Sequence, residues 1–255
     1  MDNETIISLK NITKVYKLKK RSKNSLKKVF KDDIKNAKKA LDDITLDIKK
    51  GETVALIGKN GAGKSTLLKI ISQVAYPTYG DIYVNGKIAA LIELAAGFDM
   101  QLTGIENIKL NYVLRNIKYE NYEDYEKKVI EFTDIGEYIY EPLRTYSSGM
   151  RARLGFAINI FSNSDIFLID EALSVGDAEF KQKCIDIMKK LQKDQDKTFV
   201  FVTHNLELTR LFCKRGIVII KGKVEFDGAL DDALKFYNER CNKNITNIKE
   251  LNYLF

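Results

Sequence analysis

Several residue types and segments are scarce in this chain of 255 residues, and each shortage excludes a class of protein. A single histidine excludes a multi-histidine metal centre, and the three cysteines (Cys184, Cys213 and Cys241) lack metal-ligand spacing. Their odd number fits a reducing cytoplasm. The longest apolar runs, such as Ile217 to Ile220, fall far short of the roughly 20 residues that span a bilayer. The opening residues lack the basic-then-apolar order of a secretory signal. The sequence therefore predicts a globular protein, long enough to fold without disulfides or a structural metal.

Positive charge is concentrated in one segment. Residues 17–40 hold eleven Lys or Arg and two Asp, a net charge of +9. The whole chain has a net charge of +7, so the remaining residues together carry −2. A general affinity of the whole surface for nucleic acid is therefore a poor inference from the basic isoelectric point. If the segment were helical, Leu26, Val29, Phe30, Ala37 and Leu41 would share one face. Two interpretations stay open: a basic amphipathic helix at a membrane surface or partner, and a solvated charged loop.

Hydrophobic patterning predicts an α/β protein with a helical insertion. Apolar strands are expected at Thr53–Ile57, Asp165–Ile169 and Phe199–Val202, and a strand without a polar face indicates a buried parallel sheet. A further strand is expected at Ile44–Ile48. Shorter strands are expected at Ile6–Leu9 and Thr13–Leu18, two more within Gly80–Leu94, and a hairpin turns at Lys221-Gly222. Helices are expected at Lys64–Val74, Glu179–Gln192 and Asp231–Arg240. Between about 97 and 162 the period is helical throughout, which predicts an inserted helical subdomain.

The most specific local motif is GKNGAGKST at residues 58–66, which matches the phosphate-binding loop G-x-x-x-x-G-K-[ST]. An apolar strand precedes the motif and a helix follows it, as the motif requires. Glycines let backbone N–H groups surround phosphates, and the helix N-terminus adds a positive dipole end. Lys64 is expected to reach the β- and γ-phosphates and Ser65 to bind Mg²⁺. The residues predicted to bind nucleotide in this loop are Gly58, Asn60, Gly61, Ala62, Gly63, Lys64, Ser65 and Thr66.

Two carboxylates end the apolar strand that starts at Asp165. Asp170 and Glu171 would lie at the carboxyl edge of the sheet, where ligands bind in open α/β folds. Asp170 is predicted to hold Mg²⁺, directly or through water. Glu171 is predicted to act as the general base on water. His204 directly follows the next apolar strand and is expected to face the γ-phosphate.

Between these motifs lies Tyr146-Ser147-Ser148-Gly149-Met150-Arg151, which resembles the signature sequence of ABC ATPases. The other elements of that family follow in order over roughly residues 4–228. The resemblance implies a P-loop ABC-type ATPase fold with a RecA-like core, an N-terminal antiparallel β-subdomain and an inserted helical subdomain, in a single domain over residues 1–255. Three positions depart from the common pattern: Ser148 stands where glycine is usual, Met150 where glutamine is usual, and Glu93 where the Q-loop has glutamine.

The same resemblance implies a role for further residues. Tyr16 matches the aromatic residue that stacks on adenine, His204 the switch histidine, and Asp177 the D-loop aspartate. Glu93 occupies the position of the Q-loop glutamine. The residues implied to bind the γ-phosphate held by a second subunit are Ser147, Ser148, Gly149 and Met150. The implied cofactors are ATP and Mg²⁺, and the implied assembly is an ATP-dependent, head-to-tail homodimer.

Three further segments resemble one subfamily, the ATPases that export teichoic acid, O-antigen and capsule. They are AALIELAAGFD at 89–99 with LTGIEN at 102–107, YSSGMRARLGF at 146–156, and DEALSVGD at 170–177. The resemblance implies a separate transmembrane permease contacted near Glu93 to Asp99, a place at the inner face of the cytoplasmic membrane, and a lipid-linked glycopolymer as cargo. No nucleic-acid partner is expected. Because the chain ends at Phe255, no C-terminal carbohydrate-binding module is expected either.

Three other functions remain as alternatives. An exporter of drugs or other lipids would share the same ATPase. A soluble ABC ATPase acting on DNA or ribosomes usually has two ATPase halves or long coiled-coil inserts, which are not seen here. A small-molecule kinase would share the phosphate-binding loop, but it would not need the signature.

Overall fold

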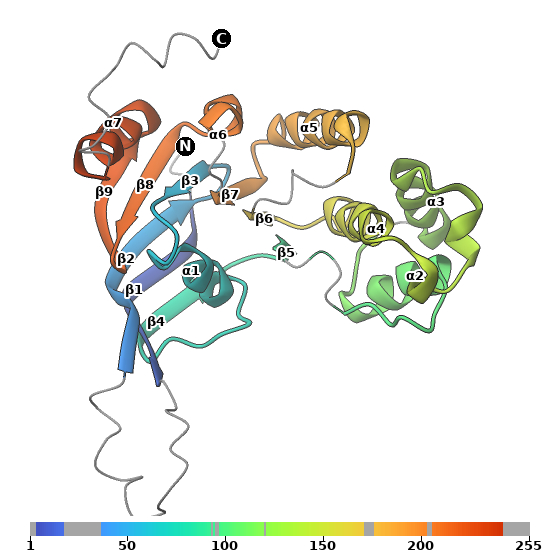
Figure 1. Cartoon of the computed structure of the whole chain (residues 1–255), viewed down its shortest axis with the longest axis horizontal. Coiled ribbons are helices and arrows are strands. Elements are labelled where there is room, and N and C mark those ends of the chain that lie inside the picture. Colours follow the sequence, from blue (N-terminus) through green and yellow to red (C-terminus); the bar gives the residue numbers. More distant parts are fainter. Residues whose placement is uncertain are drawn as a thin grey trace, which may run out of the picture. The chain divides into compact units, whose positions relative to one another are not determined.

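The computed structural model describes residues 4–17, 37–92, 94, 97–119, 121–170, 176–202 and 206–241 (Figure 1). Glu93, Glu171 and His204 therefore lie outside the described residues. The chain divides into two compact units. One unit holds Asn85–Phe201 with Met1–Glu4 and Lys49–Glu52, and the other holds Thr5–Ile48, Thr53–Val84 and Val202–Phe255.

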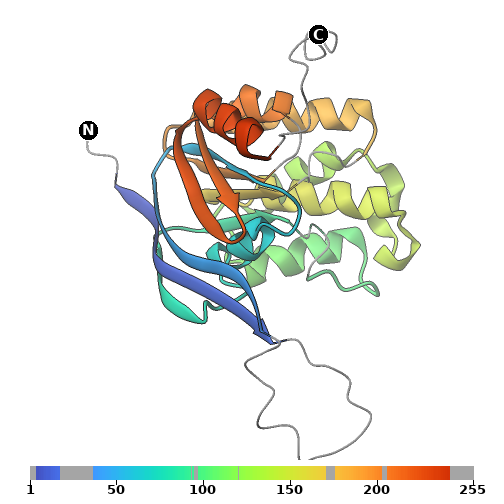
Figure 2. The ribbon, with the colours of Figure 1, turned by 60° about the vertical axis from the view of Figure 1, so that its left-hand side comes forward.

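A three-stranded sheet begins the second unit, in the order β2-β1-β4. The strands are β1 (Thr5–Lys17), β2 (Ala37–Lys49) and β4 (Tyr79–Val84), and Figure 2 shows β1 and β2 side by side in blue. β1 pairs antiparallel with β4, with Lys10 opposite Asp81. The two short strands predicted around Lys10 are one strand, because Asn11 has a left-handed backbone (φ 52°) and the register shifts between Lys10 and Thr13 without ending the strand.

The helical interpretation of the basic segment is wrong at its carboxyl end. Ala37 and Leu41 belong to β2, and Leu41 is fully buried. Asp43 has a left-handed backbone (φ 56°), which separates Leu41 from the alternating buried positions at Ile44, Leu46 and Ile48. This break in the two-residue period is why the strand predicted from alternation begins only at Ile44. Residues 18–36 lie outside the described residues, so their predicted helix is untested.

The rest of the second unit is β3 (Thr53–Ile57), β8 (Arg215–Ile220) and β9 (Lys223–Ala229) with helices α1 (Lys64–Ile71), α6 (Leu206–Phe212) and α7 (Leu230–Cys241). Every residue of β3 is buried, and β3 pairs in parallel with β8. β8 and β9 pair antiparallel, which confirms the hairpin predicted at Lys221-Gly222. α7 packs on this hairpin, where Gly216 gives room to Ala233.

The first unit has three strands in the order β5-β6-β7, namely β5 (Ile88–Leu91), β6 (Ile166–Asp170) and β7 (Thr198–Val202). β5 and β6 are parallel, with Ile88 opposite Ile166. The parallel pairs in both units confirm the parallel sheet expected from strands without a polar face. The two strands predicted around Asn85-Gly86 do not pair with each other, because β4 joins the three-stranded sheet and β5 joins β6.

Helices occupy the segment expected to be helical: α2 (Gly104–Leu114), α3 (Tyr122–Thr133) and α4 (Ser148–Ile160), with 3₁₀ turns at Gly136–Tyr140 and Leu143–Thr145. Figure 1 shows these helices in green and yellow. They share one core, which includes Ile108, Tyr125, Val129, Leu143, Tyr146 and Leu154. α5 (Ala178–Gln192) follows β6. In the described parts of the chain, no helix combines the length and apolar character needed to cross a membrane.

Two residues with helix-capping side chains, Thr103 and Glu106, fix where α2 begins. Thr103 Oγ1 accepts a hydrogen bond from Glu106 N–H, and the Glu106 carboxylate accepts one from Thr103 N–H. These two bonds make a capping box, and the hydrogen bonds to the carboxylate lower the pKa of Glu106. Asn107 fixes the same turn, because its side-chain amide donates to the carbonyls of Asp99, Leu102 and Thr103. The segment 102–107, first noted for its resemblance to a subfamily, is therefore a helix cap.

Gly155 allows α4 to contact the loop after β5. A Cβ at Gly155 would lie 2.0 Å from Leu94 O, whereas a Cβ at Gly149, in the same helix, would meet nothing nearer than Ser147 Oγ at 3.8 Å. We expect Gly155→Ala to destabilise the protein by roughly 1–3 kcal/mol, the usual cost of overpacking. Thermal unfolding should show a melting temperature lower by about 2–4 °C for each kcal/mol.

Gly149→Ala is the matched control. It should leave the melting temperature unchanged or raise it, because alanine restricts the unfolded chain and favours a helix. Equal melting temperatures for the two variants would show that α4 does not lie this close to Leu94.

Candidate nucleotide site

The phosphate-binding loop connects β3 to α1 and lies in the second unit. It turns through a hydrogen bond from Ala62 N–H to Lys59 O (3.0 Å), and α1 begins at Lys64. Lys59, Asn60 and Gly61 are exposed at its tip. The first turn of α1 contains no acidic residue, so no carboxylate neutralises the positive end of the helix dipole. The loop therefore presents what an anion site needs, exposed backbone beside a helix N-terminus.

The β8–β9 turn and β2 support this loop from behind. Gly222 N–H donates to Ala62 O (2.9 Å), and Asp42 N–H donates to Gly222 O (2.8 Å). A Cβ at Gly63 would lie 2.6 Å from Ala40 O, and Gly63 has φ 115°. Only glycine fits there. Gly61 also has a positive φ (79°), but its Cβ position is open space.

Lys64 is buried at the start of α1, with only 6% of its surface exposed. Its Nζ donates to Gly58 O (2.5 Å) and Lys59 O (3.1 Å), so the ammonium is held inside the curve of the loop. A buried cation is costly unless it is hydrogen-bonded. Phosphate oxygens entering the loop would give this ammonium anionic partners. Ser65 is exposed and Thr66 is half-buried in the first turn of the same helix.

Asp170 is the last residue of β6, in the first unit, and is half-buried after four buried apolar residues. The structure thus confirms that an apolar strand carries this carboxylate to its carboxyl end. A carboxylate oxygen suits Mg²⁺, which usually keeps several waters and takes few protein ligands. Among the described residues, no three His, Cys, Asp or Glu side chains form a metal cluster.

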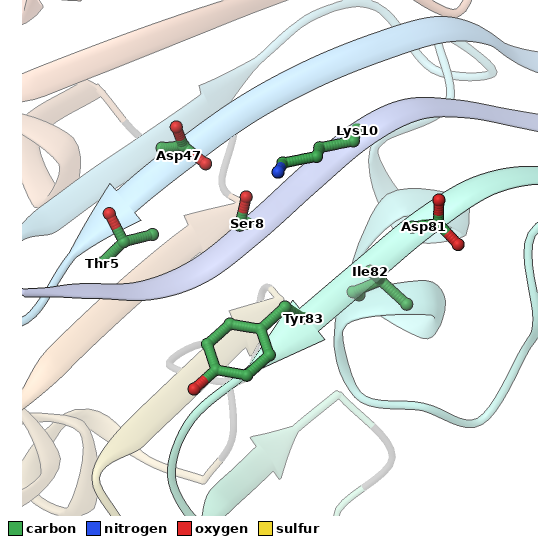
Figure 3. A pocket seen from close by; sticks show the side chains of 7 residues that line it. All are labelled: Thr5, Ser8, Lys10, Asp47, Asp81, Ile82 and Tyr83. Carbon is green, nitrogen blue, oxygen red and sulfur yellow. The ribbon is translucent and has the colours of Figure 1, made fainter.

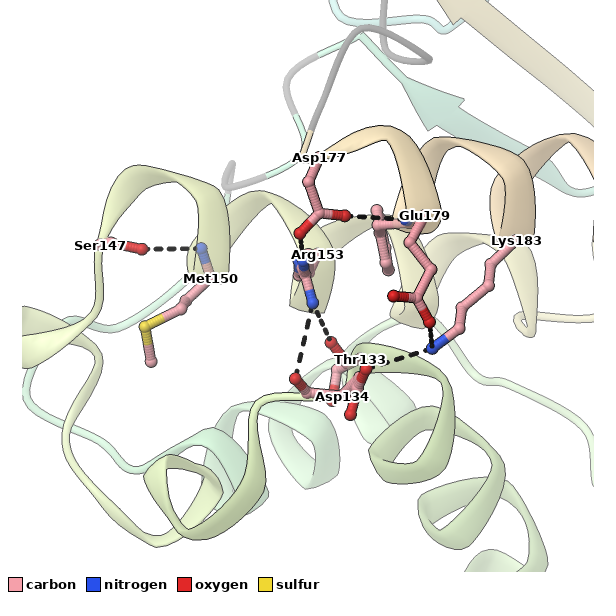
Figure 4. Close-up of polar contacts among 9 residues, drawn as sticks. Thr133, Asp134, Ser147, Met150, Arg153, Asp177, Glu179 and Lys183 are labelled. Carbon is pink, nitrogen blue, oxygen red and sulfur yellow. Dashed lines mark hydrogen bonds and ion pairs between the residues drawn. The ribbon is translucent and has the colours of Figure 1, made fainter.

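The signature segment forms the N-terminus of α4. Ser147 caps the helix, its Oγ accepting a hydrogen bond from Met150 N–H at 3.1 Å (Figure 4). Its hydroxyl proton remains available to a ligand, because a hydroxyl can accept and donate at once. Ser147 and Ser148 are exposed, and the first turn has no acidic residue. The arrangement can bind an anion by the same physics as the phosphate-binding loop.

Tyr146 and Met150 anchor this segment. Tyr146 is 3% exposed, and its hydroxyl donates to Tyr138 O at 2.6 Å. Burial raises the pKa of Tyr146 to about 12, so the phenol stays protonated. Met150 packs against the core of the helical segment. This packing explains why an apolar residue, Met150, can stand at the position where glutamine is usual.

Asp177 caps α5. Its Oδ1 accepts a hydrogen bond from Phe180 N–H at 2.9 Å, and its Oδ2 lies 2.7 Å from an Nη of Arg153 on α4. The Phe180 hydrogen bond, followed by the Arg153 charge, lowers the pKa of Asp177. Arg153 lies within the segment YSSGMRARLGF at 146–156, but the sequence assigned it no role, because its partners are 19 to 27 residues away along the chain.

Tyr16 lies near the end of β1 with 41% of its surface exposed, and Lys14 Nζ is 5.3 Å from its ring centroid. An exposed ring face is what stacking on a base requires. A separate groove of about 450 Å³ lies on the three-stranded sheet (Figure 3). It is lined by Thr5, Ser8, Lys10, Asp47, Asp81, Ile82 and Tyr83, and none of these is a residue predicted from the sequence to bind nucleotide.

A phosphate-binding loop, an apolar strand that ends in a carboxylate and a serine-capped helix are features of an ATP-binding P-loop protein. A family model described as "ABC transporter" matches residues 41–174, slightly more than half of the chain. The chain belongs to the ABC transporter family and is an ABC-type ATPase that binds ATP.

Comparison with curated proteins and solved structures agrees. The chain is 42% identical over 237 residues to the teichoic acids export ATP-binding protein TagH of Staphylococcus saprophyticus, covering 92% of this chain and 89% of that protein. It is 40% identical over 240 residues to TagH of Bacillus anthracis, covering 93% of this chain but only 43% of that protein. The dimeric post-hydrolysis structure of the ATP-binding cassette MJ0796, bound to ADP and Pi, is 26% identical with a TM-score of 0.71, covering 88% of this chain and 98% of that one. These similarities confirm the fold class and the family predicted from the sequence.

Proposed function

We propose that this chain is the ATP-hydrolysing subunit of an exporter that moves a lipid-linked cell-surface polymer, teichoic acid first, across the cytoplasmic membrane. The observation that carries the proposal is the 42% identity over 92% of the chain to an ATPase named for teichoic acid export. O-antigen or capsule-type polysaccharide is the next cargo in the same class. The chain would work at the inner face of the membrane with a separate transmembrane permease, and nucleic acid has no part in it.

In this proposal the phosphate-binding loop and the carboxylates serve one ATP. Lys64, already held at the loop, turns from carbonyl oxygens to the β- and γ-phosphates. Ser65 and Asp170 would hold Mg²⁺, which supplies charge neutralisation on the phosphate oxygens. Glu171 removes a proton from the attacking water, and His204 stabilises charge on the γ-phosphate. Tyr16 stacks on adenine, and Glu93 and Asp177 act as the Q-loop and D-loop residues.

Two copies are needed for a complete site. The capped N-terminus of α4, with Ser147, Ser148 and Gly149, would bind the γ-phosphate held by the other copy. The dimeric state of the ATP-binding cassette at 26% identity supports this arrangement. Hydrolysis removes the shared phosphate and lets the two copies separate, so a chain kept monomeric would be a weak ATPase.

Depletion of the protein in its host tests the cargo. We expect lipid-linked polymer to accumulate inside the membrane and to fall at the cell surface, because the permease has no energy source without ATP hydrolysis. Extraction of lipid-linked glycans with parallel measurement of surface polymer would show both changes.

Re-expression of the wild-type chain should restore export, whereas Lys64→Ala should not. If depletion leaves surface glycans unchanged and traps no intermediate, the polymer assignment is wrong. The ATPase would then serve another lipid or a drug.

A further inference from the structure

Asn60 and Gly61 form the tip of the phosphate-binding loop, between β3 and α1. The hydrogen bond from Ala62 N–H to Lys59 O closes a four-residue turn in which these two residues are central. Gly61 has φ 79°, the backbone conformation that the third position of a type II turn requires. Both residues are exposed. The turn is therefore closed at its two ends, and the residues at its centre face solvent.

The backbone nitrogen of Gly61 is not engaged by the turn. Among the contacts of the described residues, none is a hydrogen bond to this N–H or to the side chain of Asn60. A Cβ at Gly61 would meet no atom within 4 Å, so the space beside the nitrogen is open. In the described part of the chain, nothing therefore holds this nitrogen away from Cγ of Asn60.

This arrangement permits a covalent reaction of the Asn60 side chain. The Gly61 nitrogen gives up its proton to solvent and attacks Asn60 Cγ, so a new C–N bond forms. The C–N bond of the side-chain amide breaks, and ammonia leaves with a proton from water. Water then opens the five-membered succinimide at one of its two carbonyls, which gives aspartate or isoaspartate. The net change converts one amide and one water into a carboxylate and an ammonium ion.

A second Asn-Gly pair in the chain, Asn85-Gly86, lacks this freedom. The Asn85 side-chain amide donates a hydrogen bond to Glu4 Oε1 at 3.3 Å. A Cβ at Gly86 would lie 3.0 Å from Cβ of Asp165, and the next residue, Lys87, donates its N–H to Asp165 Oδ2 at 2.8 Å. These contacts must open before the Gly86 nitrogen reaches Asn85 Cγ. The pair therefore serves as an internal reference with the same two residue types.

We propose that Asn60 is a deamidation site whose reaction inactivates the phosphate-binding loop, and that bound nucleotide protects it. Aspartate places a negative charge where phosphates would bind, and like charges repel. Isoaspartate adds a methylene to the backbone and displaces the N–H groups that follow. Phosphate oxygens that accept hydrogen bonds from the loop hold its backbone in place, so the Gly61 nitrogen no longer reaches Asn60 Cγ. The inference needs only that the loop binds ATP, whatever the cargo of the exporter.

The experiment incubates the wild-type full-length chain at neutral pH and takes samples over time. Peptide mapping by mass spectrometry, with separation of aspartate from isoaspartate, measures modification at Asn60 and Asn85, and the same samples are assayed for ATP hydrolysis. We expect modification at Asn60 to be faster than at Asn85 on the order of tenfold, because hydrogen bonds must break first at Asn85. The fraction of ATPase activity lost should equal the fraction modified at Asn60.

Nucleotide protection is measured with a non-hydrolysable ATP analogue. At about 100 times its Kd the loop is empty for roughly 1% of the time, so modification of Asn60 should slow by roughly 100-fold. Modification of Asn85 should not change. In a chain unfolded by urea the two pairs should react at similar rates and the analogue should have no effect, because the difference comes from the fold.

Three variants connect the modification to the loss of activity. Asn60→Asp reproduces one product and should lower ATP affinity and turnover, whereas Asn85→Asp should hydrolyse ATP at the wild-type rate. Asn60→Ser has no side-chain amide to react, so its activity, relative to its own starting value, should stay constant during the incubation.

Four results would overturn the inference. They are an Asn60 that stays intact while the unfolded chain reacts, equal rates at Asn60 and Asn85 in the folded chain, less than about tenfold protection by the analogue, and an Asn60→Ser variant that loses activity as fast as the wild-type chain. Absence of ATP hydrolysis by the fresh wild-type chain would instead contradict the proposed function, since peptide mapping scores the modification without any ATPase assay.

Discussion

Replacing Lys64 with alanine should abolish ATP turnover and most nucleotide binding. The side chain is 6% exposed and its ammonium is held by Gly58 O and Lys59 O at the start of α1, so it is placed for phosphate before ATP arrives. Loss of one preorganised charged donor at a site of this kind costs about 10²- to 10³-fold in rate. Steady-state ATPase assays and a fluorescent-nucleotide titration would measure both effects.

Lys59→Ala is the control for Lys64→Ala. Lys59 is exposed, and the part of it that holds Lys64 is its backbone carbonyl, which alanine retains. Its ATPase activity should stay close to that of the wild-type chain. Turnover by Lys64→Ala at more than about a tenth of the wild-type rate would contradict the role of the loop, given the expected size of the loss.

Replacing Glu171 with glutamine should stop hydrolysis while ATP still binds. Glutamine keeps the shape of glutamate and one acceptor oxygen, but it cannot accept the proton of the attacking water. General-base removal typically costs about 10²- to 10⁴-fold. Because the γ-phosphate then persists between two copies, the variant should accumulate as an ATP-bound dimer. Size-exclusion chromatography with light scattering, with and without ATP, would detect it.

Glu179→Gln provides the comparison for Glu171→Gln. Its carboxylate is 81% exposed on α5 and is 3.7 Å from Lys183, so its loss should change neither turnover nor assembly. Rapid hydrolysis by Glu171→Gln, or a monomer in the presence of ATP, would refute the assignment of the general base and of the trapped dimer.

The active-site motifs could be predicted because their function depends on short-range spacing. The phosphate-binding loop needs glycines, a lysine and a following helix within nine residues, and all of these are local. The same holds for the signature, whose serine caps its own helix, and for Asp170 at the end of an apolar strand. The capping box at Thr103 and Glu106 is equally local, although it was not among the features predicted from the sequence.

The secondary-structure predictions were wrong where one residue interrupted the alternation of buried and exposed side chains in a strand. Asn11 and Asp43 adopt left-handed backbones within strands, so alternation broke while hydrogen bonding continued. As a result one strand was predicted as two, and part of β2 was assigned to a helix. Local sequence patterns also could not predict which strands pair with each other. The strands β4 and β5 are consecutive in the sequence, but they lie in different sheets.

The sequence by itself determined the class of this protein, because nucleotide chemistry is encoded in contiguous motifs. Only the tertiary structure decided what supports those motifs. The phosphate-binding loop rests on Gly222 and Ala40, and Asp177 is held by Arg153 from another helix. The partners in these contacts are 160, 23 and 24 positions apart along the chain, and no local pattern specifies them. They follow from the packing of whole strands and helices.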